Sequence, residues 1–257
     1  MRTLLVVLAL TCGCKNGTPD AASTTAASAS STPAPPAVAS VAPPAPVASA
    51  SGAAPAAAAP TATAGNTGSK KWDFESDKAG GPPAGFAFGR TGDGREGKWL
   101  VRADGGGNVL AQTDADTSDY RFPIAWTSEP AWKDLEIEVR CKPVSGTVDR
   151  ACGLVFRLKD ANNYYLTRAN ALENNIRLYT VKDGKRQQLA SYSGKVTGNA
   201  WHVLRAVAKG DHFEVHWDGA KVLEHRDATF ADAGAVGVWT KADSVTYFDD
   251  LSVKPAP

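Results

Sequence analysis

Three arginines and two tyrosines fall on strand-like segments between residues 153 and 179, away from the large apolar positions. They are Arg157, Tyr165, Arg168, Arg177 and Tyr179. Guanidinium groups are planar and donate hydrogen bonds in pairs, whereas aromatic rings offer flat apolar faces. On one open sheet face, these side chains would suit stacking and hydrogen bonding to a polar ring. The alternative is an ordinary solvated face, although clustered exposed tyrosines would leave apolar surface in water.

The elements that position these residues read as three short strands in series. GLVFRLK, YYLTRA and IRLYTV alternate apolar residues with others, and the turns DANN and ALENN separate them. Alternation with period two, bounded by Asp and Asn clusters, is typical of an antiparallel meander. In the first segment, Leu154, Phe156 and Leu158 are predicted to share the core face, with Val155 and Arg157 on the other.

The rest of the chain after residue 71 is also strand-like. Many short alternating segments are separated by turn residues, and Asp183-Gly184 and Asp218-Gly219 indicate tight hairpins. No segment is convincingly helical. This pattern predicts an all-β sandwich or barrel. The predicted core positions of the later strands are Trp201, Val203, Val207, Phe213, Val215, Trp217, Val236 and Val238.

Trp239 and Lys241 lie on the opposite parity from Val236 and Val238. A tryptophan that faces away from the core, with a lysine beside it, can serve as a stacking platform for a ligand. The alternative is that Trp239 belongs to a second hydrophobic layer beneath a loop.

Composition divides the chain into a signal segment at 1–14, a linker at 15–70 and a folded domain at 71–257. MRTLLVVLALTCGC has one early arginine and a short apolar run, which indicates an export signal. It resembles the signal of a bacterial lipoprotein, which implies lipidation at Cys14 and a protein anchored by lipid, facing the periplasm or the cell surface. The alternative is a plain signal peptide cut nearby.

The linker consists almost entirely of Ala, Pro, Ser, Thr and Gly, and such a composition cannot bury a core. We therefore expect a disordered tether. Charge is nearly balanced, with 28 basic and 27 acidic residues. A nucleic-acid partner would favour a strongly basic domain, so none is expected. We expect contact with a membrane only through the lipid anchor.

Export changes the interpretation of Cys141 and Cys152, because disulfides persist in oxidising compartments. If the strands that carry them pair as a hairpin about residues 145–148, the two cysteines face each other. We therefore predict a disulfide bond; two buried free thiols are the alternative.

Three segments carry a resemblance to a known superfamily: NYYLTRANALENNIRLYTVKDGKRQQLA, WHVLRAVAKGDHFEVHWDGAKV and AVGVWTKADSVTYFDDLSV. They resemble the concanavalin A-like (laminin-G-like) jelly rolls, and especially the bacterial exported 3-keto-disaccharide hydrolase-type domain. The resemblance covers essentially the whole folded part. It implies an antiparallel β-sandwich with one concave sheet, in a superfamily of carbohydrate-binding modules and sugar-cleaving enzymes.

The resemblance implies that six residues share the concave face and bind a glycan: Arg157, Tyr165, Arg168, Arg177, Trp239 and Lys241. It also implies a calcium site, since some laminin-G-like proteins hold calcium and the carboxylates at the two ends of the domain offer hard oxygen ligands. The predicted ligands are Asp73, Glu75, Asp249 and Asp250. Alternatively, Asp249 and Asp250 accept hydrogen bonds from backbone groups in turns.

No catalytic set is readable. Retaining glycosidases of the superfamily carry E-x-D-x-x-E, and the nearest match here, Glu136-Ile137-Glu138, lacks the third carboxylate. His212 and His216 lie four residues apart on a strand, too far for joint zinc coordination without help. The sequence therefore favours an exported carbohydrate-binding module. The alternatives are a 3-keto-glycoside hydrolase or lyase and a non-catalytic interaction module of the envelope.

Overall fold

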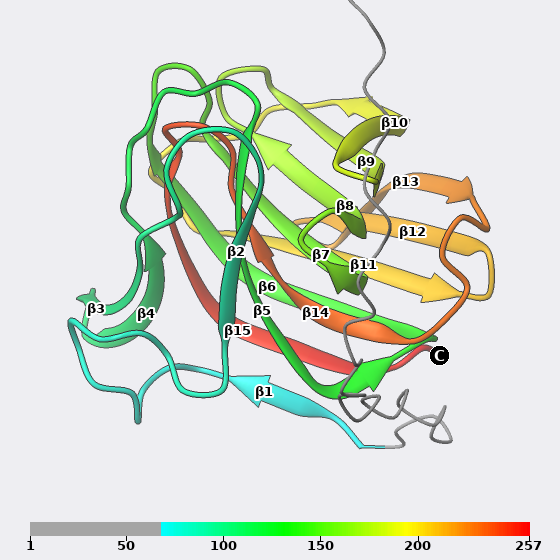
Figure 1. Ribbon diagram of the computed structural model, residues 1–257, viewed down its shortest axis with the longest axis horizontal. Helices are drawn as coiled ribbons and strands as arrows, with labels where there is room; N and C mark the ends of the chain where they lie inside the picture. Colours follow the sequence, from blue (N-terminus) through cyan, green and yellow to red (C-terminus); the bar gives the residue numbers. More distant parts are fainter. Residues whose placement is uncertain (1–67) are drawn as a thin grey trace, which may run out of the picture. The chain divides into compact units, whose positions relative to one another are not determined.

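The computed structural model describes residues 68–257, which form fifteen β-strands and no helix. The strands make two antiparallel sheets that pack face to face (Figure 1). The signal segment, the lipidation at Cys14 and the linker up to residue 67 lie outside the described residues. Within residues 68–257 there is no helix long and apolar enough to cross a membrane.

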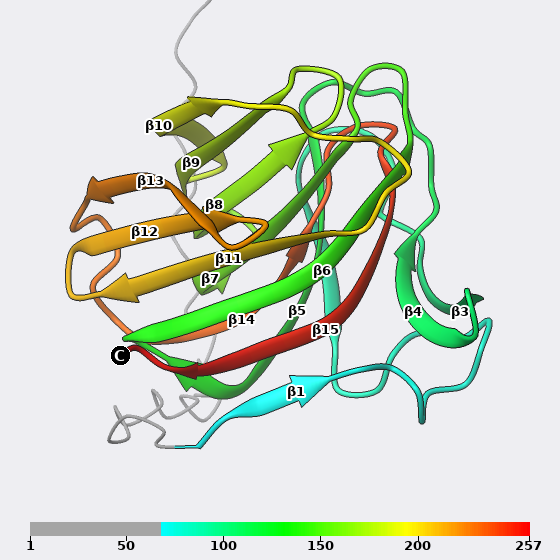
Figure 2. The ribbon, with the colours of Figure 1, turned by 180° about the vertical axis from the view of Figure 1, so that it is seen from behind.

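Sheet A contains eight strands, and its face is seen in Figure 2. In spatial order these are β13 (Ala220–Arg226), β12 (His212–Trp217), β11 (His202–Lys209), β6 (Leu135–Ser145), β15 (Val245–Pro255), β4 (Gly107–Gln112) and β3 (Trp99–Asp104), with β1 (Lys70–Trp72) also paired to β15.

Sheet B contains seven strands. In spatial order these are β10 (Lys185–Ser193), β9 (Asn175–Lys182), β8 (Asn163–Asn170), β7 (Ala151–Asp160), β14 (Gly234–Trp239), β5 (Arg121–Trp132) and β2 (Ala87–Gly92). The predicted Asp-Gly hairpins are confirmed: Asp183-Gly184 joins β9 to β10 and Asp218-Gly219 joins β12 to β13, with positive φ at all four residues. β2 was not predicted, because its glycines interrupt the apolar alternation.

The main core lies between the sheets, and both sheets contribute alternate residues to it. Phe213, Val215, Val236 and Val238 are fully or almost fully buried there, as predicted.

The predicted parity of β11 is wrong. Leu204, Ala206 and Ala208 face the core, whereas Val203 is only half-buried. Trp201, just before β11, packs with a small separate cluster that includes Val109 and Tyr247. The WHVLRAV segment carries apolar residues at both parities, so alternation alone could not select its buried face.

Sheet B has a second apolar layer on its outer face, the side away from sheet A. The buried members of this layer all come from sheet B: Phe122, Ile124, Ala151, Val155, Leu158, Tyr164, Leu166, Tyr179, Val181, Ala235 and Trp239.

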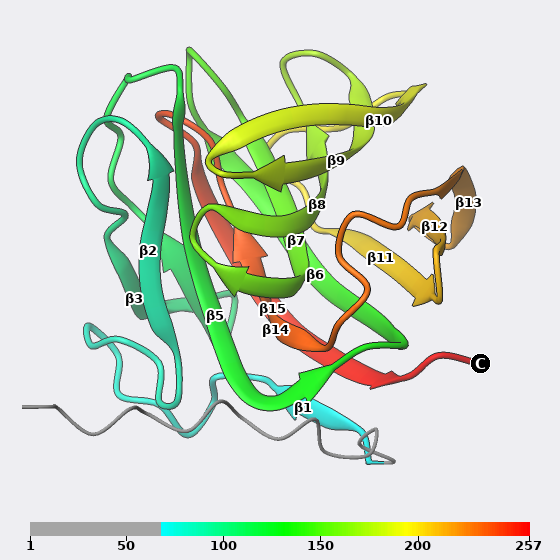
Figure 3. The ribbon, with the colours of Figure 1, turned by 45° about the vertical axis from the view of Figure 1, so that its right-hand side comes forward.

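Sheet B curls around this layer, which makes its outer face concave. The Thr91 hydroxyl on edge strand β2 lies 2.7 Å from the Tyr164 hydroxyl on β8, a strand four places away in the sheet. Tyr120, just before β5, donates to the Gly184 carbonyl (2.9 Å) and accepts the Arg186 N–H (3.0 Å). Figure 3 shows the β7–β8 and β9–β10 turns beside β5. These contacts close one part of the concave face over its apolar filling.

A β-bulge in β7 alters the predicted alternation. The register between β7 and β8 shifts between Phe156 and Asp160, and Arg157 has φ 47°. An extra residue in one strand moves the following side chains to the other face. Leu158 therefore joins the outer layer of sheet B instead of the main core.

The predicted Cys141–Cys152 disulfide is present, with a Cα–Cα distance of 6.2 Å. The prediction that the two cysteines lie on paired strands of one hairpin is wrong, because β6 belongs to sheet A and β7 to sheet B. The bond thus joins the two sheets across the core. Alternation indicates which residues of a strand are buried, but not which sheet receives the strand.

Candidate functional site

A network of buried polar side chains lies beside the outer apolar layer of sheet B, and Arg168 on β8 is its centre. The Arg168 side chain is almost fully buried. Its Nη1 donates to Asn175 Oδ1 (2.6 Å), and its Nη2 donates to Glu173 Oε2 (2.8 Å) and to the Tyr179 hydroxyl (3.2 Å). Its Nε is buried without a hydrogen-bond partner among the described residues. A buried guanidinium group is costly unless it is hydrogen-bonded, and these three partners supply that bonding. Together they hold the Arg168 guanidinium in one orientation.

Glu173, in the turn between β8 and β9, bridges the buried Arg168 to the surface. Its carboxylate accepts from Asn175 Nδ2 (3.0 Å) and pairs with Arg177 (3.3 Å). Burial would raise the pKa of Glu173, but Asn175 and Arg168 outweigh it and lower the pKa to about 2. The Glu173 and Arg177 side chains are 41% and 31% exposed. A carboxylate acceptor and a guanidinium donor therefore reach solvent side by side.

Lys241 and Asp149 form the second half of the network. The Lys241 ammonium lies 3.2 Å from Asp149 and also bonds Asp119 in the loop before β5. Asn170 donates to the other Asp149 oxygen at 3.0 Å. Burial raises the pKa of Asp149 above its ordinary value, although Lys241 and Arg168 oppose that rise.

Backbone hydrogen bonds fix the loop that carries Asp149. The Asp243 carboxylate accepts N–H groups from Thr147 (2.6 Å), Val148 (3.1 Å) and Asp149 (2.9 Å). Burial would raise the pKa of Asp243, but these N–H groups outweigh it and hold the pKa below its usual range. The β14–β15 loop therefore places both Lys241 and, through Asp243, its partner Asp149.

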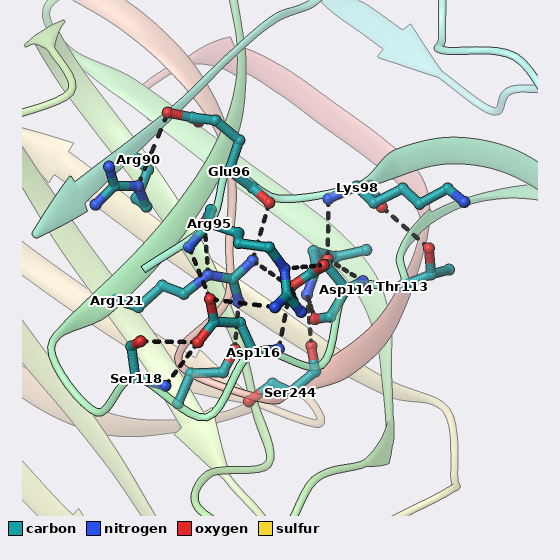
Figure 4. A network of polar contacts seen from close by, with 12 residues as sticks. Arg90, Arg95, Glu96, Lys98, Thr113, Asp114, Asp116, Ser118, Arg121 and Ser244 are labelled. Carbon is teal, nitrogen blue, oxygen red and sulfur yellow. Dashed lines mark hydrogen bonds and ion pairs between the residues drawn. The ribbon is translucent and has the colours of Figure 1, made fainter. Parts of the chain in front are cut away.

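A second network anchors the loop that carries Asp119 (Figure 4). The buried Arg121 guanidinium donates to the carbonyls of Arg95 (2.7 Å) and Ala242 (2.6 Å) and to Asp114 (2.9 Å). Asp116 accepts from the Ser118 N–H at 2.9 Å. The β4–β5 loop is thereby tied to the start of the β14–β15 loop, so the two loops that hold Lys241 and Asp119 keep their spacing.

The structure places four of the six predicted ligand-binding residues on the outer side of sheet B. Arg168 and Arg177 face each other across β8 and β9, and Lys241 follows β14. Trp239 is on this side too, but it is fully buried in the outer apolar layer beside Phe122. The alternative of a second hydrophobic layer is therefore the one that the structure shows.

The remaining two predicted residues lie elsewhere. Tyr165 is fully buried in the main core, and its hydroxyl accepts the Phe230 N–H at 3.1 Å. Arg157, in the bulge of β7, is buried and donates to the carbonyls of Lys133, Phe230 and Gly210. The expectation that all six share one face is thus wrong for these two, because the bulge redirects Arg157 and the alternation of β8 directs Tyr165 inward.

Sequence reasoning missed Asp149, Glu173 and Asn175 as site residues. Glu173 stands in the turn ALENN, directly between the two strands that carry Arg168 and Arg177. Since a short turn keeps its residues close to the strand ends, a carboxylate there was a readable partner for both arginines. Asp149 carried no such signal, because its place depends on a long-range contact with Asp243.

The four predicted calcium ligands are only partly brought together. Glu75 and Asp249 line one pocket of about 480 Å³ on the outer face of sheet A. Asp250 pairs with Lys71 at 2.7 Å and Arg140 at 3.2 Å, and Asp73 accepts the Glu75 N–H at 3.3 Å. Calcium binding there stays a prediction.

Residues 68–257 contain one group of three side chains that could hold a metal ion: His212, Glu214 and Glu224. Each offers one ligand atom, and these atoms lie within 4.8 Å of one another. Lys221 already lies 2.7 Å from Glu224 and 3.3 Å from Glu214. An ammonium group thus occupies the position between the two carboxylates. Glu136, from the weak glycosidase match, is paired with Arg205 (3.4 Å) and Lys254 (3.1 Å).

No family model matches the chain. Among curated proteins, a levanase from Bacillus subtilis (strain 168) is 25% identical over 154 residues, which cover 59% of this chain and 20% of the levanase. The chain thus spans about a fifth of the length of that relative.

Two solved structures illustrate the likeness in fold. The carbohydrate-binding module CBM66 from Bacillus subtilis has a TM-score of 0.52 and 22% identity, over 65% of this chain and 94% of the module. The VIP36 exoplasmic/lumenal domain, in its Ca²⁺/Man-bound form, has a TM-score of 0.53 and 12% identity, over 73% of this chain and 89% of that domain. With its two antiparallel sheets, the part of the chain at residues 68–257 has a concanavalin A-like β-sandwich fold, as predicted.

Proposed function

We propose that this chain is a carbohydrate-binding module, and that it binds its ligand at the network around Arg168, Glu173 and Arg177. The observation that carries the proposal is the exposed pair of Glu173 and Arg177, fixed in place by a buried arginine. Neighbouring hydroxyls on a sugar ring can donate to a carboxylate and accept from a guanidinium at once. Because the pair is already ordered, little conformational entropy is lost on binding.

Lys241 and Asp119 extend the proposed site. Asp119 is 75% exposed, and it meets Lys241 at the same end of sheet B as the β6–β7 loop that holds Asp149. The buried residues Arg168, Asp149 and Tyr179 support this surface and are not themselves open to a ligand. The site is polar and shallow, so we expect binding to single sugar units to be weak and specific in orientation.

The similar proteins favour a sugar as the ligand. One is named a carbohydrate-binding module and another a levanase. Levan is therefore the first polysaccharide to test. Neither name identifies the sugar bound by this chain, so a glycan array is the parallel measurement.

The deciding experiment compares two arginine variants of the full chain. Arg177→Ala should reduce affinity for levan, or for the strongest array ligand, by at least about tenfold, equivalent to about 1.4 kcal/mol. Arg205→Ala is the matched control, since Arg205 is 27% exposed and paired with Glu136 on the other sheet. Equal affinity of the two variants would place the ligand outside this site, and no binding on any glycan would refute the function.

A sugar-cleaving enzyme is the second candidate, and one observation favours it. Burial raises the pKa of Asp149, whereas Glu173 in the same network has a pKa of about 2. Two carboxyls whose pKa values are driven apart are the usual arrangement of a general acid and its ionised partner. Asp149 is only 1% exposed and is paired with Lys241, so this role requires the Lys241–Asp119 pair to open and admit the substrate. Turnover of 3-keto-disaccharides by the full chain, lost in Asp149→Asn, would support the enzyme.

We further propose that the chain is exported and lipid-anchored at Cys14, with residues 15–70 as a tether that holds the sandwich away from the membrane, in the periplasm or at the cell surface. The support is the apolar run followed by Gly13-Cys14 and the Ala/Pro-rich composition after it. Cys14→Ala should move the protein from the membrane fraction to the soluble fraction. Continued sedimentation of the variant with membranes would contradict the anchor.

A further inference from the structure

The pocket on the outer face of sheet A, on the opposite side of the sandwich, takes no part in the proposed site. It has a volume of about 480 Å³. This volume falls within the range of small-molecule sites, about 300–1,000 Å³. Its lining comes from β3, β4, β6 and β15, the β3–β4 turn and two loop positions: Glu75, Asp104, Gly105, Gly107, Val109, Arg140, Trp201 and Asp249.

The aromatic wall of this pocket is Trp201, which is only half-buried. Arg140 lies 4.9 Å and Lys142 5.2 Å from the centre of its ring. Lys142 also lies 5.2 Å from the ring of Tyr247, which packs with Trp201 in the small outer cluster. Cations near an aromatic ring restrain its orientation. Trp201 is therefore a positioned ring at the pocket surface, in contrast to the fully covered Trp239.

The polar lining combines acceptors and donors at close range. Arg140 donates to Asp249 at 3.0 Å while its side chain stays 42% exposed. Lys142 pairs with Asp104. Glu75 accepts the Asn108 backbone N–H at 3.1 Å, and among residues 68–257 no cationic group lies within ion-pair distance of it. The pocket thus offers carboxylate oxygens and a guanidinium group beside an aromatic ring.

This combination suits simpler ligands less well than a sugar. An isolated anion would meet the carboxylates of Glu75, Asp104 and Asp249, and would be repelled. A divalent cation needs several oxygens converging on one point. Within the described residues no three pocket carboxylates bring ligand atoms within 4.8 Å of one another, and Arg140 stands among them. A neutral ring that carries several hydroxyls fits both the polar lining and the aromatic wall.

We infer that the Trp201 pocket is a second saccharide-binding site, so that one chain holds two sugars on opposite sheets. The inference rests on the proposed function only for the class of ligand, since the residues are different. Two sites on opposite faces cannot be occupied by one short oligosaccharide. They can engage two segments of a polysaccharide, which raises the apparent affinity without any new contact.

The test measures stoichiometry by isothermal titration of the full chain with levan oligosaccharides, or with the strongest ligand on a glycan array. The wild type should bind two ligands, and Trp201→Ala and Arg177→Ala one each. In gels that contain the polysaccharide, each variant should lose at least about tenfold in retention. Phe88→Ala is the matched control, because Phe88 is an exposed aromatic residue (38%) on β2, outside both sites.

The outcomes separate the two sites. If Arg177→Ala abolishes all binding and Trp201→Ala keeps the wild-type stoichiometry, the second site is wrong and the proposed function stands. If only Trp201→Ala abolishes binding, the second site stands and the proposed first site is wrong. Asp249→Asn repeats the test without loss of the ring, so a folding defect of Trp201→Ala cannot imitate either result. Absence of binding by the wild type to every glycan refutes both.

Discussion

The outer faces of the two sheets use charged residues in opposite ways. On sheet B, Arg168 is almost fully buried beside an apolar layer, and each bond it makes is to a fixed neighbour. On sheet A, pairs such as Arg205 with Glu136 and Lys221 with Glu224 stay partly exposed on the strands. Exposed pairs contribute little because water and salt screen them, whereas a buried charge requires its partners.

This difference shows where function is to be sought on a β-sandwich. Charge alone does not separate the faces, since both carry arginine, lysine and carboxylates. Burial does: a polar group held below the surface indicates that the groups above it are positioned. By this criterion the Glu173–Arg177 pair is preorganised for a ligand, because the buried Arg168 lies beneath it. The charged side chains of β12 and β13 form an ordinary solvated face. The Trp201 pocket is intermediate, with Asp249 at 15% and Arg140 at 42% exposed.

The largest contrast is between two tryptophans. Trp239→Ala should destabilise the domain by about 3–5 kcal/mol, because it leaves a cavity in the apolar layer of sheet B. Trp201→Ala, on the outer face of sheet A, should cost less than about 1.5 kcal/mol, since the ring is already half in water. Urea unfolding followed by circular dichroism measures both. If the two variants lost similar amounts of stability, the outer face of sheet B would not be more tightly packed than that of sheet A.

The next effect concerns the link between the sheets. Replacing Cys141 and Cys152 together by serine should lower stability by about 2–3 kcal/mol, since the unfolded chain gains the freedom of an opened loop. The residues are 11 apart. Comparison of the oxidised wild type with the double variant by urea unfolding gives the value. If alkylation without reductant labels both thiols in the exported wild-type protein, the bond does not form in the cell.

Much of the fold follows from the sequence, because strict alternation and Asp-Gly turns are local signals. The sandwich class, the two hairpins and the burial of β12 and β14 rest on these signals alone. What failed is non-local or irregular: the assignment of β6 and β7 to different sheets, the bulge at Arg157 and the glycine-containing strand β2. In β11, apolar residues at both parities gave the wrong face.

The candidate site, like the fold, was predictable only in part. Arg168 and Arg177 were found because they stand at polar positions of predicted strands, and Lys241 because it shares the parity of Trp239. Their partners were not, since Asp149 reaches Lys241 only through the loop that Asp243 holds. Trp239 shows the limit of parity: it indicates the side of a sheet, but not whether that side is open to a ligand.

A smaller effect depends on pH. Glu173 has a pKa of about 2 in the fold, below the ordinary value of about 4.3. The folded state thus favours the ionised form, and the stability gained is complete above the ordinary value and lost as the pH falls through about 2. Glu173→Gln should therefore be less stable than the wild type at pH 7, with a gap that narrows between pH 5 and pH 2. Thermal midpoints across this range measure it; a constant gap would contradict the ionised bridge.

The smallest effect is expected on the solvated face. Glu136→Gln removes the carboxylate that pairs with Arg205 at 3.4 Å and Lys254 at 3.1 Å. Both cations keep contact with water, so the change should cost less than about 1 kcal/mol and decrease further in high salt. It should leave glycan binding and turnover unchanged, because Glu136 lies outside both the Trp201 pocket and the proposed site. Loss of sugar cleavage in Glu136→Gln would instead indicate that Glu136 and Glu138 on β6 are catalytic. The functional face would then be the outer face of sheet A and not that of sheet B.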